Sequence, residues 1–199
     1  MVFADPPYGT NVVKNNMVGA DFGVAKKGAY LPVIGDETTA TAIDVYKLCM
    51  ESFTRSIHIW WGSNNYSNML PVSNCWLIWD KRSDSGIENT FADCELAWTN
   101  MPSPVRVHRQ LWNGMIREGE HEKRVHPTQK PIALAEWCYE KYGKEHDIIY
   151  DPFLGSGMSL IAAENTNRTV IGCELSPEYI DIIIARWEKI SGQTATLLQ

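Results

Sequence analysis

Two short motifs, about 145 residues apart, hold most of the residues that could do chemistry. The first is Asp5-Pro6-Pro7-Tyr8, directly behind the apolar run Met1 to Ala4. Because both prolines fix φ and lack a backbone N–H, they end a strand and hold their neighbours in an extended turn. There Asp5 can accept a hydrogen bond from an amine, the Pro6 carbonyl can accept a second, and Tyr8 can stack on a flat ring. Alone, such a turn can also be a structural connection between two elements without a function of its own.

The second motif is Asp151-Pro152-Phe153-Leu154-Gly155-Ser156-Gly157, and Glu174 follows it after the next apolar run. A strand, a glycine turn and a helix beginning near Gly157 place backbone N–H groups beside a ligand, at the carboxyl end of a parallel strand. Glu174 can accept both hydroxyls of a ribose, or it can pair with a helix dipole. Leu160 replaces the third glycine of a dinucleotide fingerprint, and no Gly-Lys-Ser/Thr follows as a P-loop needs.

A third motif, His126-Pro127-Thr128-Gln129-Lys130-Pro131, lies between the other two. In this order the three motifs resemble the circularly permuted β-class of DNA amino-methyltransferases, which modify N6 of adenine or N4 of cytosine. Trp60-Trp61-Gly62 and the segment Trp76 to Lys81 add weaker similarity. The resemblance covers most of the chain and is least in Ser83 to Glu122. Met1 leaves almost nothing ahead of the first motif, so a preceding native segment stays open.

The resemblance implies a site-specific enzyme that transfers a methyl group from S-adenosyl-L-methionine to the N6 amine of adenine in a short sequence of double-stranded DNA. It implies that Asp5, Pro6, Pro7 and Tyr8 are catalytic. It assigns cofactor binding to a larger set: Asp5, His126, Thr128, Lys130, Asp151, Phe153, Gly155, Ser156, Gly157 and Glu174. In the family the glycine turn binds the cofactor, the acidic residue binds its ribose, and the segment around Lys130 holds its methionine end. No metal is expected.

The chemistry of an exocyclic amine fits these residues but leaves the substrate open. The nitrogen lone pair is delocalised into the base, so the site must hold the amine and align it with the methyl group. No cysteine follows a proline, as the usual motif for C5-cytosine methylation requires. In the family, Asp-Pro-Pro-Tyr accompanies N6-adenine methylation more often and Ser-Pro-Pro-Tyr accompanies N4-cytosine methylation. An RNA or protein-amide methyltransferase and an inactive cofactor-binding partner subunit are further alternatives, although the glutamine enzymes usually carry Asn in place of Asp5.

Charge is unevenly distributed over a chain whose net charge is −6. Val105 to Pro131 holds six basic and three acidic residues, whereas Ile132 to Gln199 holds five basic and ten acidic residues. The basic segment can meet phosphates, with a solvated charged loop as the alternative. The candidate DNA-binding residues are Lys14, Lys26, Lys27, Arg106, Arg109, Arg117, Lys123 and Arg124.

Alternating strand and helix patterns predict an α/β fold, and the resemblance makes it a Rossmann-like class I methyltransferase fold with a mostly parallel, twisted sheet flanked by helices. Predicted strands are Met1–Ala4, Ile57–Trp61, Cys75–Trp79, Cys94–Trp98, Asp147–Tyr150, Thr169–Cys173 and an edge strand at Thr194–Leu198. Predicted helices are Thr38–Arg55, Asn64–Leu70, Pro131–Tyr142, Gly157–Glu164 and Pro177–Ile190. Gly9 to Asp36 is a candidate binding loop, with disorder without function as the alternative, and about 83–125 is a small target-recognition insert. So short an insert indicates a short target sequence, or recognition shared across a homodimer.

Composition limits the class of protein. The 199 residues, 44% of them hydrophobic, suffice for one domain, residues 1–199, with a sizeable core. No apolar stretch approaches the roughly 20 residues of a spanning helix, and the pattern of a secretory signal is absent, so we expect a cytoplasmic protein. A bacterial or phage context and a cognate restriction enzyme would fit the resemblance. The five cysteines lack a Cys-x-x-Cys pair, which favours reduced, mostly buried thiols.

Overall fold

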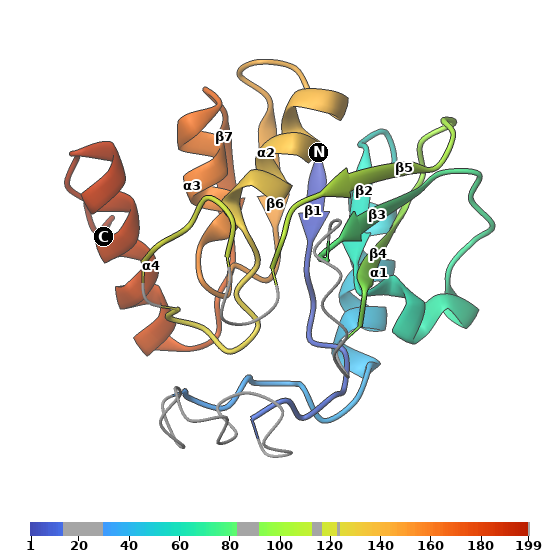
Figure 1. The fold of residues 1–199 in the computed structure, drawn as a ribbon, viewed down its shortest axis with the longest axis horizontal. Coiled ribbons are helices and arrows are strands. Elements are labelled where there is room, and N and C mark those ends of the chain that lie inside the picture. Colours follow the sequence, from blue (N-terminus) through green and yellow to red (C-terminus); the bar gives the residue numbers. More distant parts are fainter. Residues whose placement is uncertain (14–29, 83–91, 113–116, 123, 199) are drawn as a thin grey trace.

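The computed structural model describes residues 1–13, 30–82, 92–112, 117–122 and 124–198 (Figure 1). Its strands are β1 (Val2–Ala4), β2 (His58–Trp61), β3 (Trp76–Asp80), β4 (Cys94–Thr99), β5 (Arg106–Arg109), β6 (Ile148–Asp151) and β7 (Thr169–Gly172). Its helices are α1 (Ala40–Ser52), the 3-10 helix η1 (Ser63–Met69), α2 (Ile132–Tyr142), α3 (Met158–Asn165) and α4 (Pro177–Ser191). The described strands form one seven-stranded sheet in the order β5-β3-β4-β2-β1-β6-β7.

The first strand of the chain lies inside this sheet, between β2 and β6. β1 pairs in parallel with β2 on one side and with β6 on the other, where Val2 faces Tyr150. The carboxyl ends of β1, β6 and β7 therefore share one edge of the sheet, and the motifs that follow β1 and β6 meet there. Of the described strands only β4 runs antiparallel to its neighbours, so β4 begins at the edge where β1 ends.

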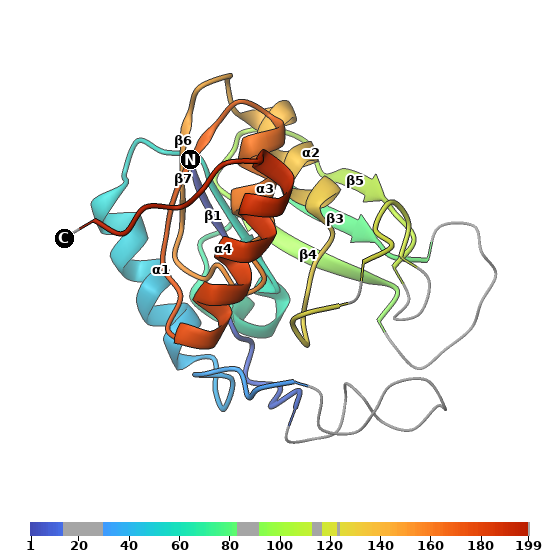
Figure 2. The ribbon, with the colours of Figure 1, turned by 90° about the vertical axis from the view of Figure 1, so that its left-hand side faces the viewer.

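Buried apolar side chains on both faces of the sheet explain why the central strands read as continuous apolar runs. Phe3 points to one face, where it packs with Leu134 and Tyr139 of α2. Its neighbour Val2 points to the other face and belongs to a cluster with Tyr46 of α1. Figure 2 shows α1 and α2 on opposite sides of the sheet. The two helices cover the two faces of β1, whose three residues are fully buried.

The predicted strands that flank the motifs are all present, as are the predicted helices, but two elements differ. The edge strand predicted at Thr194–Leu198 is wrong, because these residues form no strand and Leu197 and Leu198 remain exposed with nothing packed over them. Conversely, β5 was not predicted, because its sequence Arg-Val-His-Arg has too few apolar side chains to stand out. It pairs in parallel with β3 at the end of the sheet.

The range 83–125, expected to hold a recognition insert, includes two strands of the sheet. β4 lies between β2 and β3, and β5 forms the edge. Part of the expected insert therefore also belongs to the sheet, and its role in target recognition remains a prediction. None of the described helices is long and apolar enough to cross a membrane.

Candidate active site

A cavity of about 300 Å³ opens at the carboxyl ends of β1, β6 and β7. Ligand pockets in proteins begin at about this size. Twelve of the residues proposed from the sequence line it: Asp5, Pro6, Pro7, Tyr8, His126, Thr128, Lys130, Asp151, Phe153, Gly155, Ser156 and Glu174. The topology thus brings the three motifs, which are far apart in sequence, to a single site.

The glycine turn has a different role at each of its two glycines. Both adopt a left-handed backbone, with φ of +53° at Gly155 and +78° at Gly157. A Cβ at Gly155 would meet His126 at 3.8 Å and the Phe153 carbonyl oxygen at 3.9 Å, both ordinary van der Waals contacts, so Gly155 lines the cavity without crowding it. A Cβ at Gly157 would lie 3.0 Å from Ile183 of α4. Gly157 does not line the cavity; it allows α3 to begin close against α4.

The Glu174 carboxylate is held in a fixed orientation by backbone groups. Oε2 accepts a hydrogen bond from the Gly155 N–H at 2.9 Å, and Oε1 accepts one from the Ser176 N–H at 3.0 Å. Each oxygen keeps acceptor capacity for a further donor. Because the same carboxylate also ties the glycine turn to the end of β7, its position and that of the turn depend on each other.

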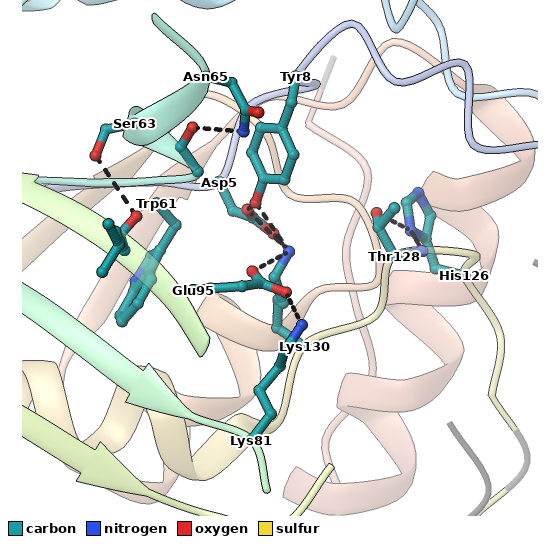
Figure 3. Close-up of polar contacts among 12 residues, drawn as sticks. Asp5, Tyr8, Trp61, Ser63, Asn65, Lys81, Glu95, His126, Thr128 and Lys130 are labelled. Atoms are coloured by element: carbon teal, nitrogen blue, oxygen red, sulfur yellow. Dashed lines mark hydrogen bonds and ion pairs between the residues drawn. The ribbon is translucent and has the colours of Figure 1, made fainter. Parts of the chain in front are cut away.

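Asp5, Tyr8 and Lys130 form a buried hydrogen-bonded cluster on the cavity wall (Figure 3). The Lys130 Nζ donates to Asp5 Oδ2 at 2.7 Å, to Asp5 Oδ1 at 3.0 Å and to the Tyr8 hydroxyl at 3.0 Å. The Tyr8 hydroxyl also donates to Asp5 Oδ1. The Lys130 side chain is only 6% exposed and that of Asp5 15%. The ammonium assigned from the sequence to the cofactor thus also contacts the predicted catalytic carboxylate.

Two further residues complete this cluster and were not proposed as site residues from the sequence. Glu95 Oε2 lies 3.4 Å from the Lys130 Nζ, and Glu95 Oε1 accepts from Lys81 at 3.0 Å. Glu95 lies close to this cluster because β4 begins at the edge of the sheet where β1 ends. The sequence did contain one indication of this role, a carboxylate inside an otherwise apolar strand. Such a charge is rarely buried without a partner.

The charges in the cluster shift each other's pKa. Burial raises the pKa of Asp5 and outweighs the opposing effect of Lys130. Burial also acts to raise the pKa of Glu95, but Lys130 and Lys81 together hold it below its ordinary value. For Lys130, burial acts to lower the pKa, and the two carboxylates overcome it and raise the pKa. Lys130 therefore stays charged and Glu95 ionised, while Asp5 is the more basic carboxylate.

His126 and Asp151 have the most shifted pKa values on the rest of the cavity wall. Burial, with Lys130 and Arg124, lowers the pKa of His126 to about 3, so this ring is neutral. Its Nδ1 accepts from the Thr128 N–H at 3.3 Å, which fixes Thr128. Burial raises the pKa of Asp151 to about 7.

The Tyr8 ring depends on Gly62, from the Trp60-Trp61-Gly62 segment. A Cβ at Gly62 would lie 1.9 Å from the Tyr8 ring, and its φ of +66° is in the left-handed region. Gly62 therefore provides the space in which Tyr8 packs beside Asp5.

Asp36 closes the loop that follows Tyr8. Its buried carboxylate accepts hydrogen bonds from the N–H groups of Gly9 at 3.1 Å, Thr10 at 3.1 Å and Val12 at 2.9 Å. Asp36 also lines the cavity. The two described ends of the candidate binding loop are therefore joined beside the site.

The candidate DNA-binding residues are spread over the surface, and none of the four described arginines lines the cavity. Arg106 and Arg109 are exposed on β5, and the Arg109 Nε lies 3.6 Å from Asp80. Arg117 lies over the Trp112 ring, and burial lowers the pKa of Arg124. Lys14, Lys26, Lys27 and Lys123 lie outside the described residues.

A mostly parallel sheet, a glycine turn at its carboxyl edge and an acidic acceptor just after the next strand are typical of the Rossmann-like class of methyltransferases. Within that class, residues 22–185 match the model of the DNA methylase family of N6 and N4 methyltransferases, so the chain belongs to this family. The predicted family and fold are thereby confirmed; the permuted order remains an interpretation.

Curated relatives match part of the chain. It is 37% identical over 78 residues to the type II methyltransferase M.BglII of Bacillus subtilis, covering 39% of this chain and 21% of the relative. It is 42% identical over 60 residues to the type II methyltransferase M.HpaI of Haemophilus parainfluenzae, covering 30% of this chain and 19% of the relative. The matched segments thus span about a fifth of the length of each relative.

Two solved structures share the fold over nearly the whole chain. The M1.HpyAVI complex with S-adenosylmethionine superposes with a TM-score of 0.50 at 18% identity, covering 94% of this chain and 87% of that one. The cytosine-N4-specific PvuII DNA methyltransferase gives a TM-score of 0.54 at 14% identity, covering 96% and 82%. At such low identity the likeness concerns the fold alone.

Proposed function

We propose that the chain binds S-adenosyl-L-methionine in the cavity and transfers its methyl group to the N6 amine of adenine in a short sequence of double-stranded DNA. The observation that carries this proposal is the position of Asp5 and Tyr8, which line the same cavity as the glycine turn and Glu174. Membership of the DNA methylase family supports a nucleic-acid substrate.

The residues of the cavity fit the proposed cofactor. Glu174 presents two oriented oxygens with acceptor capacity for ribose hydroxyls. Gly155 lines the cavity without a side chain, where any other residue would project one. The buried carboxyl group of Asp151 favours a cationic ligand when it is ionised. When bound, the cofactor supplies an electrophilic methyl group on a sulfonium, a thioether being the leaving group.

In this proposal the residues of the chain orient the amine and accept its proton. Asp5 accepts a hydrogen bond from the exocyclic amine, and the Pro6 carbonyl accepts a second, which aligns the nitrogen lone pair. The nitrogen gains a bond to the methyl carbon and loses one proton, which Asp5 accepts and passes to water. The raised pKa of Asp5 suits this step. Tyr8 offers an aromatic face to a base extruded from the duplex.

N4-cytosine methylation is the second candidate, since cytosine presents the same kind of amine to the same acceptors. The Asp-Pro-Pro-Tyr sequence favours adenine. A homodimer that shares recognition, and a cognate restriction enzyme, are further predictions for the whole protein. An RNA substrate, a protein amide and an inactive subunit are the remaining alternatives.

The test is the identity of the methylated product. The protein is incubated with labelled S-adenosyl-L-methionine and unmethylated DNA, the DNA is digested to nucleosides, and these are identified by mass spectrometry, with RNA run in parallel. We expect N6-methyldeoxyadenosine. N4-methyldeoxycytidine would instead support the second candidate, N4-cytosine methylation. Cofactor binding without any methylated nucleoside would contradict both adenine and cytosine methylation.

A further inference from the structure

Lys130 is shared between two carboxylates, only one of which belongs to a motif. Asp5 lies 2.7 Å from its ammonium and Glu95 3.4 Å (Figure 3). We propose that Glu95 is a positioning residue for methyl transfer: by holding the Lys130 ammonium, it frees the Asp5 carboxylate to accept the substrate amine. This inference rests on the proposed function.

The geometry shows why a second carboxylate is needed. In the structure, the ammonium of Lys130 contacts both oxygens of Asp5 and the hydroxyl of Tyr8. If Asp5 were its only anionic partner, an amine that took over the Asp5 oxygens would leave a buried ammonium unpaired. An uncompensated buried charge is strongly destabilising. Glu95 gives Lys130 an alternative partner without moving it into water.

Glu95 is itself held from two sides. Its backbone lies in β4, in register with Trp79 of β3. Its second oxygen pairs with Lys81 at 3.0 Å, so two lysines on separate segments fix one carboxylate. The Lys81 Nζ also lies 5.7 Å from the centre of the Trp79 ring. Such a restrained side chain can hold Lys130 at a defined position, which a mobile surface glutamate could not.

Glu95 also acts on Asp5 through its charge. Its negative charge raises the pKa of Asp5, while Lys130 lowers it. Without that negative charge, and with Lys130 pairing with Asp5 alone, the pKa of Asp5 would fall. Activity requires ionised Asp5, so the acid limb of the pH profile would move to lower pH. The groups that face Asp5 are Lys130, Glu95 and Tyr8, with Asp151 and Tyr66 nearby.

The test is Glu95→Gln, which keeps the shape of the side chain and removes its charge. We expect kcat to fall by about tenfold to a hundredfold, the range for one lost charge-assisted hydrogen bond. The acid limb of kcat should move to lower pH, and the Kd for S-adenosyl-L-methionine, measured by calorimetry, should stay close to that of the wild type. Glu140→Gln, on the exposed side of α2, is the matched control and should change none of these quantities.

The outcomes separate this inference from the function on which it rests. An active wild-type protein whose Glu95→Gln variant keeps both kcat and the acid limb overturns this inference alone. A lower kcat with an unmoved acid limb would indicate a structural role and also overturns it. A wild-type protein without methyl transfer to any nucleic acid overturns both.

A second variant covers the case in which Glu95→Gln does not fold. Glu95→Asp keeps the charge but shortens the side chain by one methylene, which weakens its contact with Lys130. We expect an intermediate kcat and an acid limb near that of the wild type. Full activity in this variant would show that the contact is not needed.

Discussion

At the residue scale, the site contains three buried carboxyl groups that differ in the number of their positively charged partners. Glu95 has two lysine partners, Asp5 has one, and Asp151 accepts a hydrogen bond from the Phe153 N–H at 2.9 Å. Asp5 and Asp151 therefore keep raised pKa values in a cavity proposed to receive a cation. We therefore expect the protonation of Asp151 to affect cofactor binding and that of Asp5 to affect the rate of methyl transfer.

Asp151 predicts a pH dependence of cofactor affinity. Because its pKa lies at about 7, it is largely neutral below that pH and ionised above it. A nearby cationic ligand is attracted to the ionised form, so the Kd for S-adenosyl-L-methionine should fall several-fold as pH rises through about 7. Calorimetry at a series of pH values on both sides of 7 measures this Kd. Asp151→Asn should flatten the profile, and an equally steep profile in that variant would assign the titration to another group.

Gly62 predicts a loss of activity through Tyr8. In Gly62→Ala the new Cβ must displace the Tyr8 ring, so kcat should fall by tenfold or more while cofactor binding persists. Gly192 also has a left-handed backbone, with φ +69°, and nothing lies within 4 Å of the position that a Cβ would take there. Gly192→Ala is thus a control for backbone strain, which costs about 1–3 kcal/mol at such positions. Equal kcat in both variants would argue against a role for Tyr8 packing.

At the element scale, the loop after the first motif depends on Asp36 for its closure. Asp36→Asn removes the charge from three hydrogen bonds to backbone N–H groups, so we expect the free energy of unfolding to fall by about 1–3 kcal/mol. Amide exchange at Gly9, Thr10 and Val12 should become faster. Denaturant unfolding and hydrogen exchange measure both effects. Asp44→Asn, at an exposed position of α1, is the control, and similar losses in the two variants would contradict the assignment.

The elements that could be predicted from the sequence are those with continuous burial. β1 and β2 are buried along their whole length, so their apolar runs were visible without the structure. β5 escaped prediction because an edge strand needs few apolar side chains, and Thr194–Leu198 has apolar residues but no surface to cover them. A hydrophobic pattern in the sequence indicates which residues are buried. These two segments show that an exposed segment can form a strand and that an apolar segment need not.

At the scale of the whole molecule, the candidate site was predictable as a list of motifs but not as an arrangement. The motif residues around Asp5 and Gly155 were proposed from the sequence and line one cavity. Glu95 was missed because its role arises from the reversed direction of β4, which brings it to the carboxyl end of β1. Strand order and direction are set by tertiary packing, so contacts across the sheet do not appear in any local pattern.

The central claim, that Asp5 performs chemistry in a cavity built by the glycine turn, is tested most directly by measuring cofactor binding and methyl transfer in the same two variants. Asp5→Ala should bind S-adenosyl-L-methionine with near wild-type affinity, since Glu95 still neutralises Lys130. Its methyl transfer to DNA should fall by at least about a hundredfold. Gly155→Trp should abolish binding, because its side chain would project into the cavity that Gly155 lines. Full methyl transfer by Asp5→Ala would contradict the account.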